Sequence, residues 1–581
     1  MLIYLEFCLA AALAAVAFIS PGIGANWFCA LERVFCALAR RRGLTILVVS
    51  FLPIVLRVLL LPILPIPVPG VQDEFSYLLA ADTFAHGRLA NPPHPMWIHF
   101  ESMHILQQPT YASMYFPAQG LIQAAGQVIG GHPWLGVLVS VGIMCGAICW
   151  ALQGWIPARW ALLGALLAVM RFGVFSYWMN SYWGGAPAAI GGALALGALP
   201  RIKRRRRIRD AILMGFGLAI LACSRPYEGM VYSLPLGVAV LVWILGKNAP
   251  PLKVSARRIV LPLLVVLGTA LAGLGYYFWR VTGSPWRIPE EVNLETYHMG
   301  RLFYWQSPVA ELAYHHEVMR DNYRYLLQSF NEARSLQGAF VYTLAKLLGM
   351  WLFFIGPAFT LPMVGVMAII PYGYPWSRLS ARLRFLLITG AAGSLGLALE
   401  IFFFPHYAAP MTALVIALVV QAMRYLRLWQ WHGRPTGQFL VRAVPLISGS
   451  MFLACLGANA LGCNLLPYYP YAWYSSPPGI LERASVQSQL QQSDGRHLVI
   501  VHYRPDHNIH REWVYNEADI DGAKVVWARE MGPAQDQALI DYFRGRQVWV
   551  VDADESPTTL RPYSVPSGRA GPESGQPINR R

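Results

Sequence analysis

Residues 44–70 read LTILVVSFLPIVLRVLLLPILPIPVPG, and residues 71–95 continue without a break as VQDEFSYLLAADTFAHGRLANPPHP. The first stretch is long and apolar enough to cross a bilayer, which takes about 20 residues of helix. The second stretch is polar from its second residue, so Asp73 and Glu74 stand side by side where the chain leaves the apolar segment. Carboxylates at a membrane boundary are costly unless they are solvated, paired or used in chemistry. The acidic pair therefore predicts a functional site at the membrane surface.

The composition is that of an α-helical polytopic membrane protein. Of the 581 residues, 56% are hydrophobic and only 13% are charged, whereas a soluble domain has about 25% charged residues. Shifts in polarity along the chain predict about 11–12 transmembrane helices. The candidate spans are residues 3–20, 44–66, 134–152, 160–178, 186–200, 210–224, 229–246, 259–279, 349–371, 385–404, 408–427 and 440–461.

The net charge of +16 predicts membrane topology rather than binding to nucleic acid. The basic residues cluster in short loops such as Arg40–Arg42 and Lys203–Arg207, and short loops rich in Lys and Arg stay in the cytoplasm. Alternation then places the long loops at 67–133 and 280–348, and everything after residue 462, on the outer face. No nucleic-acid partner is expected, and the surrounding membrane lipids are the partners of the apolar surface.

Four regions are predicted along the chain. Residues 1–43 form an N-terminal hydrophobic segment and a basic cytoplasmic linker, and residues 44–462 form the transmembrane domain with its two long outer loops. Residues 463–563 form a small C-terminal α/β domain on the outer side, and the Gly- and Pro-rich residues 564–581 form a disordered tail. Within the α/β domain we expect strands at 498–504, 524–530 and 547–554 and a helix at 536–545. Residues 116–131 are expected to form a helix on the outer surface rather than a span.

Asp73 and Glu74 begin a helical segment that is predicted to run to about Gly87. Acids at a helix N-terminus are favoured by the helix dipole, so one interpretation is that both only stabilise the helix. The other is that Asp73, and with less support Glu74, acts as the general base that removes a proton from an acceptor hydroxyl. Attack on an activated sugar needs one such base, and a phosphate leaving group needs no separate acid.

A second group of candidate residues lies in outer loops and turns. Arg225 and Glu228 in the turn SRPYEG form either a structural ion pair or part of a phosphate site, because the guanidinium fork suits phosphate oxygens. His406, beside Tyr407 in PHYAAP, either binds or protonates a phosphate or caps the preceding helix. Further candidates for the same anionic pocket lie in the second long loop, at Tyr297, His298 and Arg301.

The sequence predicts neither a metal site nor a disulfide framework. Nearly all of the eight cysteines lie in or beside apolar spans, which favours packing over cross-linking. The first long loop also contains histidines and an acid whose spacing matches no metal signature, at His86, His94, His99, Glu101 and His104.

The acidic pair after a transmembrane helix, the long outer loop and the segment QQPTYASMYFPAQGLIQAAGQVIGG (107–131) resemble C-type (GT-C) membrane glycosyltransferases. The closest resemblance is to the branch of protein O-mannosyltransferases and bacterial lipid A aminoarabinose transferases, and it covers roughly residues 44–430. Two features depart from the pattern: Phe116-Pro117-Ala118 stands where members often have a proline pair, and residues before 44 form an extra segment.

The resemblance implies an inverting transfer of a sugar from a polyprenyl-phosphate donor to a lipid, glycan or protein acceptor on the outer face. It places the catalytic acid in the first outer loop, at Asp73 or Glu74. Such a reaction requires no cofactor, and a divalent metal ion is optional because the leaving group is a phosphate monoester.

The main alternative is a transporter or flippase of lipid-linked sugars. Transporters tend to contain internal repeats and charged or broken segments near the middle of the bilayer. No repeat is seen, but Arg57 and Arg171 lie within or near the ends of candidate spans and favour this alternative. A glycan polymerase or ligase and a non-catalytic scaffold are further alternatives. Arg-rich short loops without a eukaryotic retention signal favour the bacterial inner (plasma) membrane.

Overall fold

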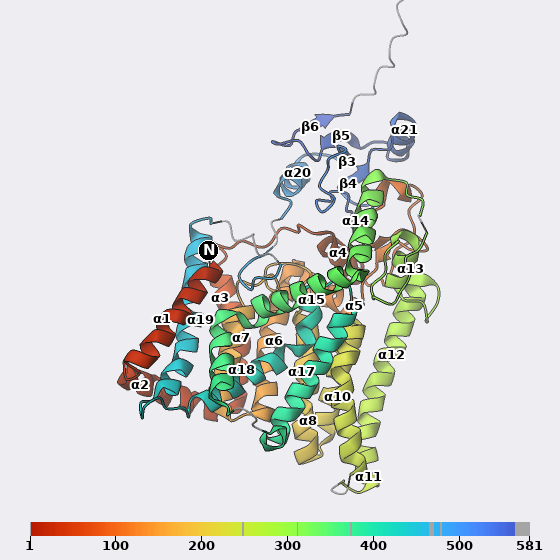
Figure 1. Ribbon diagram of the computed structural model, residues 1–581. Helices are drawn as coiled ribbons and strands as arrows, with labels where there is room; N and C mark the ends of the chain where they lie inside the picture. Colours follow the sequence, from red (N-terminus) through yellow and green to blue (C-terminus); the bar gives the residue numbers. More distant parts are fainter. Residues whose placement is uncertain are drawn as a thin grey trace, which may run out of the picture.

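A computed structural model describes residues 2–246, 249–310, 312–371, 375–463, 470–476 and 479–563. These residues form a bundle of helices with a small α/β domain at one end (Figure 1). The fold class expected from the sequence, a polytopic helical protein with a C-terminal α/β domain, is therefore confirmed. The predicted disordered tail at 564–581 lies outside the described residues.

Nine helices of the described part of the chain are long and apolar enough to cross a membrane. They are α1 (Leu2–Ile19), α3 (Arg42–Leu59), α6 (Pro133–Trp155), α10 (Pro226–Leu245), α11 with η2 and α12 (Leu252–Thr282), α15 with η3 and α16 (Leu336–Ile369), α17 (Ala381–Leu399), η5 with α18 (Pro405–Leu426) and α19 (Thr436–Ala460).

Three further expected spans are helices of the bundle, but each is shorter or less apolar than a membrane crossing requires. They are α7 (Ala158–Phe172), α8 (Ala186–Arg205) and α9 (Ile208–Ser224). Helices α7 and α9 have 15 and 17 residues. Helix α8 is rich in Gly and Ala and ends in basic residues, which lowers its hydropathy. These three helices account for the difference between twelve candidate spans and nine.

Both arginines that the sequence places in spans are satisfied by protein groups. Arg57 on α3 donates to Asn180 Oδ1 at 2.8 Å and to the backbone carbonyls of residues 64 and 65 at 2.6 and 2.8 Å. Arg171 on α7 donates to two backbone carbonyls at 2.7 and 2.8 Å and lies 3.5 Å from Glu6 of α1. Buried charges are normally paired in this way. Their role is therefore to join helices, and they no longer favour a transport pathway.

The segments between the spans form a layer at one end of the bundle (Figure 1). Its elements are α4 (Gln72–Ala85), η1 (Trp97–Phe100), the two-stranded hairpin β1 (Ile105–Leu106) and β2 (Ala112–Ser113), α5 (Pro117–Gly130), α13 (Pro289–Tyr297) and α14 (Glu317–Arg334). Helix α5 is the helix expected at 116–131. It approaches α6 so closely that a Cβ on Gly126 would lie 2.2 Å from the backbone nitrogen of Gly136. At the opposite end lie α2 (Ala25–Arg40) and η4 (Trp376–Arg378).

The C-terminal domain is a four-stranded sheet with the order β4-β3-β5-β6. Strands β3 (His497–His502), β4 (Val525–Arg529) and β5 (Gln547–Asp552) are parallel, and β6 (Leu560–Pro562) is antiparallel to β5. Helices α20 (Leu481–Gln492) and α21 (Pro533–Tyr542) complete it. The three strands and the helix expected from the sequence are all present within three residues of their predicted ends, whereas α20 and β6 were not predicted.

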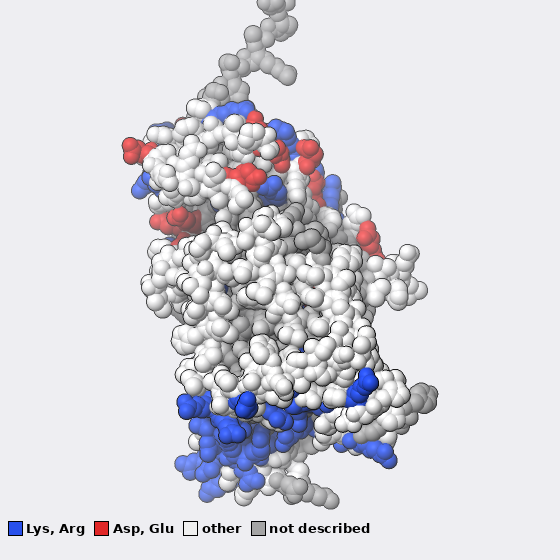
Figure 2. Space-filling model, turned by 90° about the vertical axis from the view of Figure 1, so that its left-hand side faces the viewer, with Lys and Arg blue, Asp and Glu red and all other residues white. Residues whose placement is uncertain are grey.

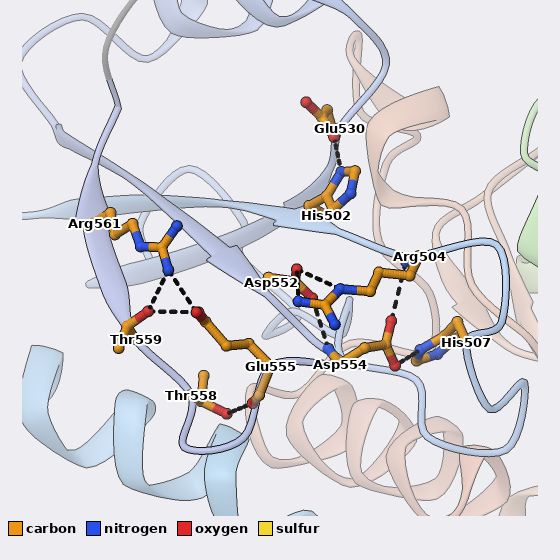
Figure 3. A network of polar contacts seen from close by, with 10 residues as sticks. All are labelled: His502, Arg504, His507, Glu530, Asp552, Asp554, Glu555, Thr558, Thr559 and Arg561. Carbon is orange, nitrogen blue, oxygen red and sulfur yellow. Dashed lines mark hydrogen bonds and ion pairs between the residues drawn. The ribbon is translucent and has the colours of Figure 1, made fainter.

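A polar network closes the carboxyl end of this sheet (Figure 3). Arg504 lies 2.8 Å from Asp552, and the Nδ1 atom of His507 lies 2.7 Å from Asp554. These contacts hold the loop that follows β3 against the end of β5. The same loop continues to Ile509, which contacts Gln72 of α4.

Charge separates along the long axis of the molecule (Figure 2). On the face shown, Lys and Arg gather at the end away from the C-terminal domain, Asp and Glu lie with further Lys and Arg on and near that domain, and a nearly uncharged band lies between them. This distribution agrees with the alternation deduced from the short basic loops. The assignment of the basic end to the cytoplasm stays a prediction.

Candidate functional site

The two acids at the start of α4 have different surroundings. Glu74 is buried, and its Oε2 accepts hydrogen bonds from the N–H groups of Gly70 at 2.7 Å and Val71 at 3.1 Å. Its Oε1 accepts from the N–H of Tyr182, in the turn between α7 and α8, at 2.9 Å. Burial raises the pKa of Glu74 to about 7, and the three N–H donors oppose that rise. These contacts make Glu74 an anchor that holds the start of α4 to the bundle.

Asp73 is instead accessible, with 23% of its side chain exposed. Its Oδ1 accepts a short hydrogen bond from the hydroxyl of Tyr115. Its Oδ2 lies 3.8 Å from the Nδ1 atom of His104. Successive residues of a helix project about 100° apart, which explains why Glu74 faces the bundle whereas Asp73 faces Tyr115 and His104.

A cavity of about 100 Å³ lies next to Tyr115. It is bounded by the start of α10, by α13, by the segment before η5 and by the loop preceding α5. The charged and hydroxyl-bearing residues of its wall are Tyr77, Tyr115, Ser224, Arg225, Tyr227, Glu228, Glu290, Glu400 and Tyr407. Three candidates from the sequence lie in this wall: Arg225, Glu228 and Tyr407.

Arg225 is the cation of this wall, as far as the described residues go. Its guanidinium lies 3.6 Å from Glu228 and stacks 4.3 Å from the ring centre of Tyr407. Glu290 and Glu400 face the same cavity, and burial raises the pKa of Glu290 although Arg225 opposes the rise. A phosphate that binds Arg225 would therefore have to replace Glu228 as its partner.

His406 is not one of the residues that line the cavity, although the next residue, Tyr407, is. Its Nδ1 atom is 2.9 Å from the hydroxyl of Tyr177, and its backbone N–H donates to the same hydroxyl at 3.1 Å. Its ring packs edge-on against Trp183, with 4.8 Å between the ring centres. This aromatic surrounding supports Tyr407, the next residue, and so the position of Arg225.

The three candidates from the second long loop do not act as one group. The Tyr297 hydroxyl donates to Glu101 at 2.8 Å, away from the cavity. His298 has a buried Nε2 with no hydrogen-bond partner among the described residues. Burial lowers the pKa of His298 to about 3, and His104 and Arg301 add to that lowering. Of the three, His298 therefore lies near His104, and Arg301 acts on His298 through its charge.

Several residues of the site were not found from the sequence. Tyr77 and Tyr115 stack with their ring centres 4.4 Å apart, and Tyr115 orients Asp73. Glu290 and Glu400 come from segments more than 200 residues after Asp73. The only available signal was the aromatic content of the segment before the surface helix, which also suits an interfacial layer.

The C-terminal domain packs directly on the helix that contains Asp73. Gln72 donates to the carbonyl of Ile509 at 2.6 Å, and the ring of Phe75 stacks on Tyr515 with 4.0 Å between the centres. Arg529 donates to the carbonyl of Glu101 at 2.7 Å. The domain is thus part of the support of the site.

The described residues contain no group of three or more His, Cys, Asp or Glu side chains placed to hold a metal ion. One histidine and the acid of the first loop are instead engaged in other contacts. His94 lies 3.2 Å from Asp521, and Glu101 lies 2.8 Å from His315.

No protein-family model matches the sequence, and no curated protein matches it. Among solved structures, the chain is similar to ArnT from Cupriavidus metallidurans in the apo state, with 14% identity and a TM-score of 0.45, over 91% of this chain and 93% of that one. It is also similar to the oligosaccharyltransferase of Archaeoglobus fulgidus in complex with Zn and sulfate, with 12% identity and a TM-score of 0.45, over 87% and 67%. Another structure of the latter protein, AglB, holds an inhibitory peptide and a dolichol-phosphate. At these identities and scores the likeness carries no conclusion about family, substrates or residues.

Proposed function

We propose that this protein is an inverting membrane glycosyltransferase that moves a sugar from a polyprenyl-phosphate donor to a lipid, glycan or protein acceptor. The observation that supports this most directly is Asp73. It is an accessible carboxylate held by Tyr115 beside a polar cavity at the end of an apolar helical bundle. The site lies at the boundary where a prenyl chain in the membrane and a polar acceptor from the outer side can meet.

In the proposed reaction Asp73 accepts the proton of the acceptor while the acceptor atom attacks the anomeric carbon. Attack from the face opposite the phosphate inverts the configuration at that carbon. The phosphate leaves as a monoester with the prenyl chain. Because it is a good leaving group, no general acid is needed.

Arg225 offsets the charge that develops on the leaving phosphate. Tyr407 stacks on the guanidinium, and His406 fixes the backbone on which Tyr407 stands. Movement of Glu228 away from Arg225 would open the guanidinium fork to phosphate oxygens, a geometry that Arg favours. Glu74 keeps the start of α4 in place during this step, and the proposed mechanism has no step through a metal ion.

The test compares the purified parent with Asp73→Asn, using a panel of radiolabelled polyprenyl-phosphate sugars and a membrane extract as acceptor. We expect the parent to release polyprenyl phosphate and Asp73→Asn to lose about 10²-fold or more of that rate, the usual contribution of a general base. Glu291→Gln is the matched control, because Glu291 is exposed on α13. Equal turnover in EDTA and in Mg²⁺ would support a reaction without a metal.

The transporter alternative predicts a different result in the same preparation. If no donor is consumed but labelled lipid crosses a bilayer that contains the protein, the proposed function is wrong. The location of the cavity at the rim of the bundle, and the satisfied state of Arg57 and Arg171, support the transferase.

A further inference from the structure

His104 has an unusual backbone conformation close to Asp73. Its φ is 63°, in the left-handed region that residues with side chains rarely adopt. Its carbonyl is fixed from two sides, by the hydroxyl of Ser76 at 2.6 Å and by the N–H of Met114 at 3.1 Å. Backbone conformations of this kind are held in place where the direction of a side chain matters. Here the conformation turns the imidazole toward Asp73.

The imidazole and the carboxylate leave one atom each without a partner. The Nδ1 atom of His104 is buried and has no hydrogen-bond partner among the described residues, and the side chain is 14% exposed. The Oδ2 atom of Asp73 has none either, since Tyr115 binds Oδ1. The two free atoms are 3.8 Å apart, which is too far for a hydrogen bond between them. Buried polar atoms such as Nδ1 of His104 normally have partners. This atom faces the accessible Oδ2 of Asp73, so the gap between them points to a ligand atom that both can bind.

We propose that Asp73 and His104 together hold the nucleophilic hydroxyl of the acceptor. The hydroxyl donates its hydrogen to Oδ2 of Asp73 and accepts a hydrogen bond from Nδ1–H of His104. An oxygen about 2.8 Å from each atom fits the observed gap, with an angle of roughly 85° at the oxygen. The inference rests on the proposed function and adds a recognition residue for the acceptor to it.

The arrangement serves a displacement at the anomeric carbon. The hydroxyl proton passes to Asp73, and the oxygen forms a bond to the anomeric carbon. The bond from that carbon to the phosphate oxygen breaks, and its electron pair leaves with the phosphate. His104 keeps its proton throughout, so its role is to hold the oxygen with a lone pair facing the sugar.

The surroundings keep His104 uncharged. Burial lowers the pKa of His104, and the neighbouring carboxylate of Asp73 opposes that lowering. Among the described residues, His298, Tyr115 and Tyr323 are further titratable groups near it. A neutral imidazole offers a hydrogen bond without cancelling the charge that makes Asp73 a base.

The pair also selects the chemical class of the acceptor. A hydroxyl can donate and accept at the same atom, as this gap requires. A protonated amine has no lone pair for Nδ1–H, and an amide nitrogen accepts poorly. The site is therefore built for an alcohol on a sugar, lipid or hydroxyl side chain rather than for a nitrogen acceptor.

His104→Gly is the first test, because glycine adopts a positive φ without strain and should fold. With a membrane extract as acceptor, we expect kcat/KM for the acceptor to fall about ten- to hundred-fold, as expected when a buried hydrogen bond is lost. The KM for the lipid-linked donor should stay within two-fold of the parent. Free imidazole added to His104→Gly should restore part of the rate, which a purely structural role would not allow.

His104→Asn is the second variant, since Asn tolerates the same backbone region, and His86→Asn is the matched control because His86 is exposed at the end of α4. Unchanged acceptor kinetics in both His104 variants, or an equal loss for donor and acceptor, would overturn the proposal while an inactive Asp73→Asn keeps the proposed function. A parent that consumes no donor would overturn both. Transfer to an amine or amide acceptor at the rate seen with an alcohol would also overturn it.

Discussion

A single hydrogen bond, from Tyr115 to Asp73, sets the orientation of the Asp73 carboxylate. The phenol donates to Oδ1, which leaves Oδ2 as the free basic oxygen. Burial, and then the charge of Asp73, raise the pKa of Tyr115 well above its ordinary value, so the hydroxyl remains a donor across the working range of pH. The orientation of the carboxylate therefore depends on this one group.

We expect Tyr115→Phe to lower kcat about ten-fold, since Asp73 would rotate more freely and a hydrogen bond to its charged carboxylate would be lost. The fold should persist, because the ring still stacks on Tyr77 at 4.4 Å between centres. Turnover of lipid-linked donor is the measurement, and Tyr276→Phe, whose ring is 50% exposed, is the control. An unchanged kcat would show that Tyr115 does not orient the base.

Because of His298, the free energy of unfolding decreases as the pH falls below neutral. Its pKa is about 3 in the folded protein, below the ordinary 6.5, because burial disfavours the charged ring. A group whose pKa is lowered by folding makes its full contribution to the free energy of unfolding above its unfolded pKa, here 6.5. That contribution is lost as the pH falls toward the pKa in the folded protein. From pH 7 to pH 5 the loss from this residue is about 2 kcal/mol.

We therefore expect the melting temperature in detergent to fall between pH 7 and pH 5, and to fall less in His298→Gln. Scanning fluorimetry at the two pH values is the measurement. His132→Gln is a comparison outside the site. An equal fall in the parent and in His298→Gln would contradict the assignment.

At the scale of elements, the contact between α4 and the C-terminal domain links that domain to the site. Phe75 stacks on Tyr515 with an interplanar angle of 5°, and Arg483 lies 5.0 Å from the centre of the Phe75 ring. The rings are buried, with exposed fractions of 6% each. The stack therefore fixes the helix whose first turn contains Asp73.

Tyr515→Ala should lower the free energy of unfolding by about 3 kcal/mol, the usual cost of truncating a buried aromatic side chain. We expect the C-terminal domain to become sensitive to limited proteolysis and donor turnover to fall several-fold. Tyr542→Ala is the control, since that ring is 41% exposed on the same domain. Protease resistance equal to that of the parent would mean that the stack does not support docking.

The elements also show how far the sequence alone reaches. Strands β3, β4 and β5 were predicted because short apolar runs between turn residues have few other structures. Asp73 was predicted because an acid at a membrane boundary is conspicuous. Tyr115 and Glu400 were not, because only the folded chain brings residues from separate loops to one cavity. Glu74 was predicted as a base with less support than Asp73, but its buried surroundings were not predicted, since one of its donors is the N–H of Tyr182, 108 residues away.

At the scale of the whole molecule, the separation of charge is the feature that orients it. The run PRIKRRRRIRD at residues 200–210 contains seven basic residues and one acid. It lies at the end of the bundle opposite the C-terminal domain, where Lys and Arg gather (Figure 2). Translocation of such short basic loops across a membrane is strongly disfavoured.

We expect the basic end to face the cytoplasm and the C-terminal domain to face the outside. In spheroplasts, external protease should remove an epitope tag placed after residue 581 and leave intact a tag inserted at residue 250, next to α11. Detergent should expose both tags, which controls for cleavage of each site. Protection of the C-terminal tag would reverse the topology. It would then place Asp73 on the cytoplasmic side, because α4 and the C-terminal domain are in direct contact, and the donor would have to be presented from that side.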